Sequence, residues 1–381
     1  MAIKNLIIFG TRPEAIKMAP LVHEFQKNPD IFNTRVCVTA QHREMLDQVL
    51  EFFEILPDYD LDLMKPNQTL TGITAAILLE LETVLSDFQP DYVYIHGDTT
   101  TTMASSIAAF YSGAKICHVE AGLRTFNKYA PFPEEINRSV AGVIADIHYA
   151  PTQTSKDNLI RENKPAGSIV ITGNTVIDAL NYSQAKVNST NYKDPEIEKL
   201  GSFLNLERQI LLVTGHRREN HGQGFIAICQ ALRRLAGNNP ELQVVYPVHL
   251  NPKVQGPVYE YLSGIPNIYL IEPLAYPAFI WLMSRSHIVL TDSGGVQEEA
   301  PSLGKPVLVM RETTERPEAV KAGTVLLVGT NTDKIVNETQ KLIADKALYE
   351  SMGRRHNPYG DGMACGRIVE HILKVHKDEN T

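Results

Sequence analysis

Cysteine is scarce in this chain, with four residues in 381, and these four are far apart and form no Cys-x-x-Cys pair. Such spacing indicates neither a zinc site nor a disulfide framework, so we expect buried thiols. The sequence also lacks an apolar run of about 18 residues and a signal peptide's long hydrophobic segment. We therefore expect a cytoplasmic protein that does not enter a membrane.

The chain also has no excess of basic residues. The chain has 36 Lys and Arg against 44 Asp and Glu, which gives a formal net charge of −8. Nucleic acid and anionic membranes need a broad basic surface, so neither is expected as the main partner. Any anion must instead be held locally, and not by a P-loop, because Gly-x-x-x-x-Gly-Lys-Ser/Thr does not occur.

Two further motifs are absent or incomplete. The stretch Gly222-x-Gly224-x-x-Ala227 resembles a dinucleotide fingerprint, but it lies well beyond its strand, behind five charged or polar residues. His118-x-Glu120 resembles the start of a zinc deaminase motif, yet no Pro-Cys-x-x-Cys follows it. We therefore predict neither an NAD site nor a metal site.

Short apolar runs alternate with longer helix-type segments along the whole chain, which is typical of parallel sheets built from βαβ units. The expected strands are residues 6–9, 36–39, 92–95, 116–119, 169–172, 210–213, 244–248, 288–290 and 307–310. A polar stretch at 181–209 has the composition of a linker or surface excursion, and both halves open with a strand that runs into a basic turn.

This pattern predicts an α/β protein with two Rossmann-like, doubly wound domains that face a central cleft. We expect an N-terminal domain at 1–175 that carries catalytic carboxylates and a C-terminal domain at 176–362 that binds a nucleotide. Residues 363–381 are expected to form a closing helix that packs back on the N-terminal domain.

The most informative stretch is Asp-Ser-Gly-Gly-Val-Gln-Glu-Glu at residues 292–299, where an apolar run ends in two glycines and an acidic segment. Backbone N–H groups at a helix N-terminus bind anions, and glycines allow phosphates to approach closely. Glu298 and Glu299 would then reach the ribose hydroxyls of a nucleotide. An ordinary strand-to-helix turn is the alternative interpretation.

Cations and acids recur at other strand ends. Arg12 and Lys17 follow the first strand, and Arg316 lies in a charged loop after a later strand, where each is either a cleft residue or a solvated charge. Carboxylates follow two more strands, at Asp98 and Glu120.

A third acid comes from the proline-rich stretch 131–138, as Glu134 or Glu135. Each carboxylate has a structural alternative, for example helix capping. Three acids at one site would suit proton transfer, because like charges raise one another's pKa. His216, flanked by arginines, is a candidate ligand contact or a hydrogen-bonded structural histidine.

Six stretches together resemble one family. They are Gly-Thr-Arg-Pro-Glu-Ala-Ile-Lys-Met-Ala-Pro at 10–20, Gly-Asp-Thr-Thr at 97–100, His-Val-Glu-Ala-Gly-Leu-Arg-Thr at 118–125, Pro-Glu-Glu-x-Asn-Arg at 133–138, Gly-His-Arg-Arg-Glu-Asn at 215–220 and Ser-Gly-Gly-x-Gln-Glu-Glu-Ala-Pro at 293–301. The family is the non-hydrolysing UDP-N-acetylglucosamine 2-epimerases, and the likeness runs in order from residue 3 to residue 362.

The resemblance implies a glycosyltransferase-B fold and a cytoplasmic homodimer that interconverts UDP-N-acetylglucosamine and UDP-N-acetylmannosamine without metal or NAD, for the synthesis of cell-surface polysaccharides. The implied catalytic residues are Asp98, Glu120, Glu134 and His216. The implied contacts to UDP are Arg12, Lys17, Phe279, Ser293, Gly294, Gly295, Glu299 and Arg316. A second, activating substrate site would involve Gln41, His42, Gln68, Arg217 and His249.

Other functions stay open at this point. A glycosyltransferase of the same architecture would share the nucleotide cradle but need an acceptor groove, and related epimerases act on modified UDP-N-acetylhexosamines. A hydrolysing relative would release free N-acetylmannosamine, and a non-catalytic UDP-sugar sensor would not need the acids. The three carboxylates favour elimination and re-addition of UDP over glycosyl transfer and over a sensor, and the exact UDP-sugar stays open.

Overall fold

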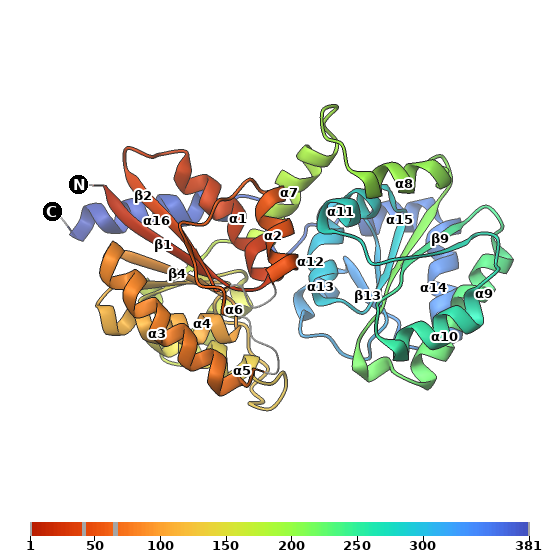
Figure 1. Ribbon diagram of the computed structural model, residues 1–381. Coiled ribbons are helices and arrows are strands. Elements are labelled where there is room, and N and C mark those ends of the chain that lie inside the picture. The colour runs from red at the N-terminus through yellow and green to blue at the C-terminus, as the bar shows by residue number, and fades with distance from the viewer. Residues whose placement is uncertain (1, 40–42, 64–67, 380–381) are drawn as a thin grey trace. The chain divides into compact units, whose positions relative to one another are not determined.

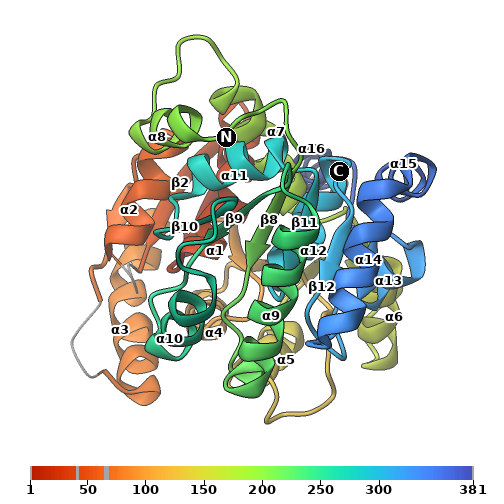
Figure 2. The ribbon, with the colours of Figure 1, turned by 90° about the vertical axis from the view of Figure 1, so that its right-hand side faces the viewer.

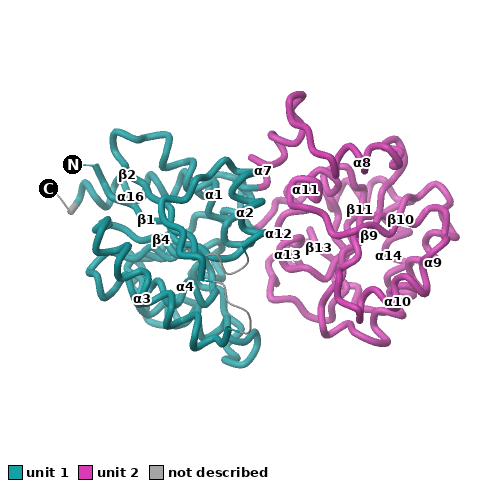
Figure 3. The backbone as a smooth tube through the Cα atoms, viewed as in Figure 1, with its two compact units in different colours: residues 1–179, 359–381 teal, residues 180–358 magenta. Residues whose placement is uncertain are grey.

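A computed structural model describes residues 2–39, 43–63 and 68–379, and the chain divides into two compact units (Figure 3). Unit 1 comprises residues 1–179 and 359–381, and unit 2 comprises residues 180–358. The domain limits expected at residues 175 and 362 lie a few residues from the unit limits at 179 and 358. Helix α7 (Thr175–Val187) continues across the first limit, and Tyr359 accepts a hydrogen bond from the Asn174 backbone in unit 1, at 2.7 Å.

In the described part of unit 1, seven parallel strands form a sheet with the order β3-β2-β1-β4-β5-β6-β7. They are β1 (Ile3–Phe9), β2 (Phe32–Val38), β3 (Tyr59–Asp60), β4 (Tyr92–His96), β5 (Lys115–Val119), β6 (Ile147–Ala150) and β7 (Ile169–Ile171). Strand β1 pairs with β2 on one side and β4 on the other. The chain order therefore reverses at β1, which makes its carboxyl end a topological switch point, where open α/β sheets bind ligands.

Successive side chains of a strand point to opposite faces of the sheet, and here the side chains on both faces are apolar. Helices therefore cover both faces. Val93 and Ile95 join the core cluster under helices α3 and α4, whereas Tyr94 between them contacts Phe25 of α1. The helices of unit 1 besides α7 are α1 (Arg12–Gln26), α2 (Arg43–Phe52), α3 (Leu70–Phe88), α4 (Thr100–Ser112), α5 (Glu134–Ile144), α6 (Gln153–Arg161), the 3₁₀ turn η1 (Ala166–Ser168) and α16 (Ala364–Glu379).

The chain returns to unit 1 for its last helix, α16, which packs beside α1 (Figure 1). Ile368 and Ile372 are fully buried, one helical turn apart, and His371 lies edge-on against Tyr149 of β6. Asp178 accepts the Cys365 backbone N–H at 2.9 Å at the start of the helix. These contacts attach the C-terminal segment to the first unit.

In the described part of unit 2, six parallel strands form a sheet with the order β10-β9-β8-β11-β12-β13. They are β8 (Ile210–Thr214), β9 (Gln243–Pro247), β10 (Ile268–Ile271), β11 (Ile288–Thr291), β12 (Val307–Val309) and β13 (Val325–Leu327). The helical elements are α8 (Pro195–Phe203), η2 (Arg218–Asn220), α9 (Gln223–Asn238), α10 (Pro252–Leu262), α11 (Tyr276–Arg285), α12 (Gly294–Ser302), α13 (Pro317–Ala322), α14 (Thr332–Ala344) and α15 (Lys346–Gly353).

Helices α9 and α14 lie side by side over this second sheet and share its main apolar core (Figure 2). The order reverses again at β8, which pairs with β9 and β11. Unit 2 therefore repeats the architecture of unit 1, with its own switch point at the carboxyl ends of β8 and β11.

The expected α/β class with two parallel sheets is confirmed, and all nine expected strands coincide with observed ones. Short strands β3, β6, β10 and β13 were not expected. The polar stretch 181–209, expected as a linker or surface excursion, contains helical segments: α7 enters it, and Asp194 caps α8 by accepting the backbone N–H groups of Glu196 and Ile197. Among the described residues, no helix is both long and apolar enough to cross a membrane.

Candidate active site

Glu120 lies directly after β5, and its carboxylate is almost completely buried. Its Oε2 accepts hydrogen bonds from Lys17 Nζ of α1 and from Asn174 Nδ2, the latter at 2.9 Å, and lies 3.6 Å from His96 Nε2. Burial alone would raise the pKa of Glu120, but Lys17 and His96 together hold the pKa well below its usual range. The side chain is therefore a buried anion at neutral pH.

The backbone at Glu120 has an unusual conformation that belongs to this arrangement. Its φ is +61°, in the left-handed region that non-glycine residues rarely adopt. Such a conformation costs roughly 1 to 3 kcal/mol and persists only where surrounding contacts determine it. Here the contacts of the carboxylate with Lys17 and Asn174 supply that constraint.

His118, two residues earlier, supports the neighbouring turn. Burial lowers its pKa to about 3, so the ring is neutral at pH 7. With the carbonyl of Gly97 2.7 Å from Nε2, that nitrogen must carry the proton and donate it. His118 is therefore a structural group that holds the turn after β4, next to Asp98.

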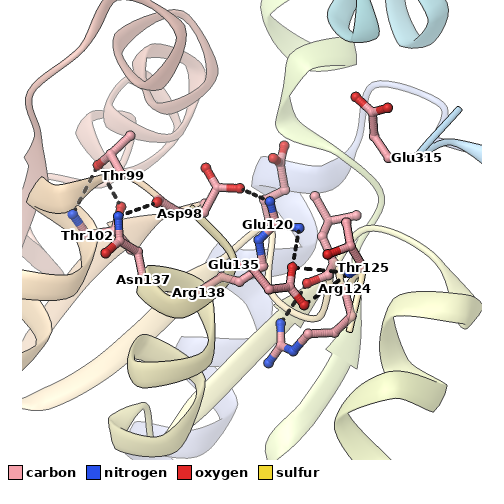
Figure 4. A network of polar contacts seen from close by, with 12 residues as sticks. Asp98, Thr99, Thr102, Glu120, Arg124, Thr125, Glu135, Asn137, Arg138 and Glu315 are labelled. Carbon is pink, nitrogen blue, oxygen red and sulfur yellow. Dashed lines mark hydrogen bonds and ion pairs between the residues drawn. The ribbon is translucent and has the colours of Figure 1, made fainter. Parts of the chain in front are cut away.

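Asp98 lies in this turn and is held from helix α5 (Figure 4). Its Oδ2 accepts a hydrogen bond from Arg138 Nη2 at 2.5 Å, and its backbone carbonyl accepts one from Asn137 Nδ2 at 3.0 Å. Burial raises the pKa of Asp98 above its ordinary value, although the Arg138 guanidinium opposes this, and the carboxylates of Glu120 and Glu134 add to the increase. Asp98 thus takes up a proton more easily than Glu120 does.

Helix α5 begins with two glutamates that the sequence could not tell apart. Glu135 accepts the backbone N–H groups of Thr125 and Phe126, the latter at 2.8 Å, and so anchors the loop that precedes the helix (Figure 4). Glu134 contributes no such bond, and its Oε2 is buried without a hydrogen-bond partner among the described residues. The structure therefore makes Glu135 the structural residue and leaves Glu134 available for chemistry.

Glu14 organises the turn after β1. Its Oε2 accepts the backbone N–H groups of Gly10 and Thr11, at 3.0 and 2.8 Å, in a capping box at the start of α1. Its Oε1 accepts the Thr99 hydroxyl at 2.5 Å, which ties this turn to the one that carries Asp98. Half-buried Arg12, the first residue of α1, is positioned by this cap.

In unit 2, the glycine-rich turn after β11 opens helix α12, as expected from the sequence. Ser293 is the N-cap residue, and a Cβ placed on Gly294 would lie only 2.6 Å from Arg316 Nη1. The guanidinium therefore packs directly against the helix N-terminus, where backbone N–H groups and the helix dipole favour an anion. Only glycine at position 294 permits this approach.

Two acids of α12 have different partners. Glu298 Oε1 accepts a hydrogen bond from Arg316 Nε at 2.7 Å, so this carboxylate orients the arginine. Glu299, one position further, accepts the Tyr276 hydroxyl of α11 at 3.2 Å. Phe279, one turn further along α11, is half-buried.

Three arginines surround Glu315 next to this turn. Its Oε1 accepts hydrogen bonds from Arg316 at 2.8 Å and Arg217 at 3.2 Å, and its Oε2 accepts one from Arg311 at 2.6 Å. Burial would raise the pKa of Glu315, but the three guanidinium groups outweigh burial and lower the pKa to about 2. A carboxylate that is ionised at neutral pH thus holds the arginines together despite their mutual repulsion.

His216 follows β8, and the fully buried Asp292 after β11 holds its loop. Asp292 accepts the backbone N–H groups of His216 and Arg217 at 3.0 and 2.9 Å, and its carboxylate lies 3.4 Å from His216 Nδ1. The His216 ring stacks on His249, with 5.5 Å between centroids. Burial lowers the pKa of His216, and Asp292 only partly opposes this.

The structure thus groups the predicted residues within each unit. Lys17, Asp98 and Glu120 lie together in unit 1, with Glu134 acting electrostatically on Asp98. The groups in unit 2 are the turn at 293–295 with Arg316, and the stacked histidines with Arg217. Gln68 is half-buried just before α3, whereas Gln41 and His42 lie outside the described residues.

Sequence reasoning assigned no role to several residues that hold this site: Arg138, Asn174, Asp292 and Glu315. Helical spacing could have indicated Arg138, because residues four apart share one face of a helix and Glu134 precedes it by four. Asp292 directly follows a strand at the switch point, which is also a usable signal. Nothing in the sequence pairs Asn174 with Glu120.

This arrangement can perform two kinds of chemistry. Carboxylates with pKa values shifted in opposite directions can divide the roles of fixed anion and proton carrier. A helix N-terminus with an adjacent guanidinium can bind a phosphate or diphosphate. Unit 1 therefore has the groups for proton transfer, and unit 2 has those for an anionic leaving group.

Comparison with known proteins agrees with this chemistry. A family model described as UDP-N-acetylglucosamine 2-epimerase matches residues 23–373. The Salmonella typhimurium UDP-N-acetylglucosamine 2-epimerase is 57% identical over 367 residues, which cover 96% of this chain and 97% of that protein. A crystal structure of the Neisseria meningitidis UDP-GlcNAc 2-epimerase bound to UDP-GlcNAc is 53% identical, with a TM-score of 0.89 and coverage of 98% of this chain and 100% of that one.

A Listeria monocytogenes structure, described as a putative UDP-N-acetylglucosamine 2-epimerase, is 47% identical and superposes with a TM-score of 0.91, covering 100% of this chain and 98% of that one. The likeness therefore extends over both units. The chain belongs to the UDP-N-acetylglucosamine 2-epimerase family.

Proposed function

We propose that this protein inverts C2 of UDP-N-acetylglucosamine to give UDP-N-acetylmannosamine, reversibly. Membership of the family supports the reaction, and the Neisseria meningitidis relative binds UDP-GlcNAc. The observation that carries the proposal is the pair of acids after adjacent strands: Glu120 is stabilised as an anion, whereas Asp98 is shifted toward protonation. Proton removal and proton return both need such groups.

The 2-acetamido group gives the C2–H bond little acidity, so direct deprotonation of C2 is too slow to be the first step of the inversion. Breaking the C1–O bond first, with departure of UDP, creates positive charge at C1 that acidifies C2. A carboxylate then takes the C2 proton, and the electron pair forms the C1=C2 bond of a 2-acetamidoglucal. Protonation of C2 from the other face and return of UDP to C1 complete the inversion.

Each group of residues has a task in this sequence. Arg12, Arg316 and the turn at 293–295 would stabilise the departing diphosphate, with Lys17 close to it. Asp98, Glu120 and Glu134 would supply a base, an acid and a stabiliser of the cation. Phe279 and Glu299 would hold the uridine, and His216 would contact the substrate.

Proton NMR in deuterated buffer tests the reaction, with purified protein and UDP-N-acetylglucosamine and no added metal or NAD. We expect UDP-N-acetylmannosamine with deuterium at C2. Free N-acetylmannosamine with stoichiometric UDP would mean hydrolysis instead. An unchanged spectrum would contradict the proposed substrate and point to a modified UDP-N-acetylhexosamine or to glycosyl transfer.

Substitution of the acids tests their assignment. Asp98→Asn and Glu120→Gln should each reduce kcat by about 10²- to 10⁴-fold, the usual contribution of general acid–base catalysis. Affinity for UDP, measured by calorimetry, should change little, because the proposed UDP contacts lie mainly elsewhere. Asp157→Asn is a matched control, since this exposed carboxylate accepts a hydrogen bond from Gln153 of its own helix and lies outside the proposed site. Near-normal turnover in either acid variant would refute the assignment.

We further infer a cytoplasmic homodimer. The unit 1 surface supports the pairing, because α3 and α4 border a groove of about 620 Å³ lined by Leu78, Leu79, Leu85, Ala108 and Tyr111 among others. Leu79 is 68% exposed and Tyr111 79% exposed, which leaves a large apolar surface for a second copy to cover. The activating substrate site also stays a prediction, and of its residues Arg217 and His249 lie beside His216.

A further inference from the structure

The side chains of Arg124 and Arg138 in unit 1 are both buried but are used very differently. Arg124 makes a bidentate contact with Glu162, at 2.6 and 2.7 Å, and donates to the Leu123 carbonyl at 2.7 Å. Among the described residues, Arg138 makes one hydrogen bond, from Nη2 to Asp98, and its Nη1 lies 3.5 Å from Glu135. Its Nε is buried without a hydrogen-bond partner among the described residues.

A buried N–H group without a partner is destabilising, so stability alone does not explain Arg138. Arg124, in which each of the three side-chain nitrogens donates a hydrogen bond, shows what a structural arginine looks like in the same unit. Arg138 instead directs its one strong contact at a proposed catalytic carboxylate. This contrast indicates that the role of Arg138 lies in its contact with Asp98.

We propose that Arg138 is a positioning residue for Asp98, and that this single contact sets both the orientation and the charge of the carboxylate. The proposal deepens the proposed function and rests on the role given there to Asp98. Arg138 is not assigned a contact with substrate.

The orientation follows from helix α5. Asn137 holds the backbone carbonyl of Asp98 at 3.0 Å, and Arg138 holds its Oδ2, so neighbouring helical residues fix the main chain and the side chain (Figure 4). No described residue donates to Oδ1, which stays available for a proton. Glu134 is four residues before Arg138, on the same face of the helix, so one rigid element positions two of the three acids.

The charge follows from the groups around Asp98. Burial disfavours its ionised form, and Glu120 after β5 and Glu134 of α5 act in the same direction. Arg138 of α5 is the largest opposing influence, and Lys17 of α1, which is bonded to Glu120, is a smaller one. Without the guanidinium, Asp98 would bind its proton at higher pH, because burial and two anions would remain.

The experiment compares Arg138→Met with Arg138→Lys. In the methionine variant, kcat at pH 7 should fall by roughly 10- to 100-fold, and the limb of the pH–rate profile governed by Asp98 should move to higher pH. The lysine variant keeps the positive charge, so this limb should return toward its original position. Its kcat should stay reduced, because an ammonium group lacks the planar fork that orients a carboxylate.

A carbon NMR titration of the Asp98 carboxyl gives a readout that does not depend on turnover. The Asp98→Asn variant identifies the signal, and in Arg138→Met the signal should titrate at higher pH than in the unsubstituted protein. An unchanged titration would overturn the proposal, whatever the rates. If the unsubstituted protein shows no epimerisation, the proposed function fails, and the titration still decides the role of Arg138.

Arg124→Met is the matched control, because it removes a buried arginine of the same unit that does not touch Asp98. It should lower the melting temperature without moving the pH profile. A shift equal to that of Arg138→Met would show a general effect of destabilisation and would refute a specific role. If Arg138→Met fails to fold, Arg138→Lys carries the test, and an unreduced kcat in that variant would overturn the proposal.

Discussion

At the scale of single residues, adjacent strand ends give two similar acids opposite properties. Asp98 and Glu120 are both buried, which by itself raises a carboxyl pKa. Glu120 bonds Lys17 and Asn174 and stays ionised, whereas Asp98 has one arginine against burial and two nearby carboxylates. The neighbouring side chains, and not the type of residue, therefore make Glu120 a fixed anion and Asp98 a proton carrier.

Glu315 allows a pH prediction at the same scale. Its pKa is lowered from 4.5 to about 2, so its interactions stabilise the fold fully above pH 4.5 and are lost as pH falls toward 2. Glu315→Gln should therefore lower the free energy of unfolding near neutral pH. Its difference from the unsubstituted protein should shrink below about pH 4.5.

Denaturant unfolding of both proteins from pH 7 down to the acid limit of the native state measures this. The exposed Glu260→Gln provides a control, for which we expect little difference at any pH. A Glu315→Gln difference that stays constant between pH 6 and 3 would contradict the linkage to the three arginines.

At the scale of elements, the turns after the strands determine where the functional side chains lie. In unit 1 these turns carry Asp98 and Glu120, and in unit 2 they carry His216 and Ser293. Two turns are held by buried carboxylates: Glu14 accepts backbone N–H groups of the turn after β1, and Asp292 accepts those of the turn that carries His216. The carboxylates satisfy backbone N–H groups that have no partner in a helix or sheet.

Gly122, two residues after Glu120, gives a test of such a turn. Its φ is +90°, and an added Cβ would lie 2.3 Å from the Ser155 carbonyl oxygen of α6. Gly113 has a similar φ of +81°, but a Cβ there meets nothing within 4 Å. The two glycines therefore form a matched pair.

Gly113→Ala should cost about 1 kcal/mol of stability and leave turnover unchanged, since only the strained backbone conformation contributes. Gly122→Ala should cost roughly 3 kcal/mol or more, because α6 must move, and should also reduce kcat through displacement of Glu120. Denaturant unfolding and rate measurements on both variants check this. Equal losses of stability would show that steric contact with α6 is unimportant.

At the scale of the whole molecule, the exposed apolar face of α3 and α4 predicts how two copies associate. Leu79→Glu should convert the expected dimer to monomers, because a charge would be buried in the interface without a partner. Sedimentation velocity at micromolar concentrations measures the state. Leu56→Glu is the control, since Leu56 is 89% exposed but lies after α2, outside the groove. A dimeric Leu79→Glu protein, or a monomeric unsubstituted one, would refute this interface.

Much of the molecule follows from local sequence. Apolar runs ending in glycine, acid or arginine predict where parallel strands stop, and the carboxyl ends of such strands are where ligands bind. These patterns predict the α/β class, the main strands and the positions of Asp98, Glu120 and the turn at 293–295. The family motifs extend this to the reaction, because they too are local stretches of residues.

Only the tertiary structure decides which of these residues are structural and which remain available. It assigns Glu135 to a loop and leaves Glu134 free, pairs Lys17 with Glu120, and places Arg138 on Asp98 and Arg316 over Gly294. Asp98 and Arg138 are 40 residues apart in the chain, and Lys17 and Glu120 are 103 apart. Local sequence determines which segments form helices and strands, but burial, charge and pKa depend on neighbours that folding brings together from other elements.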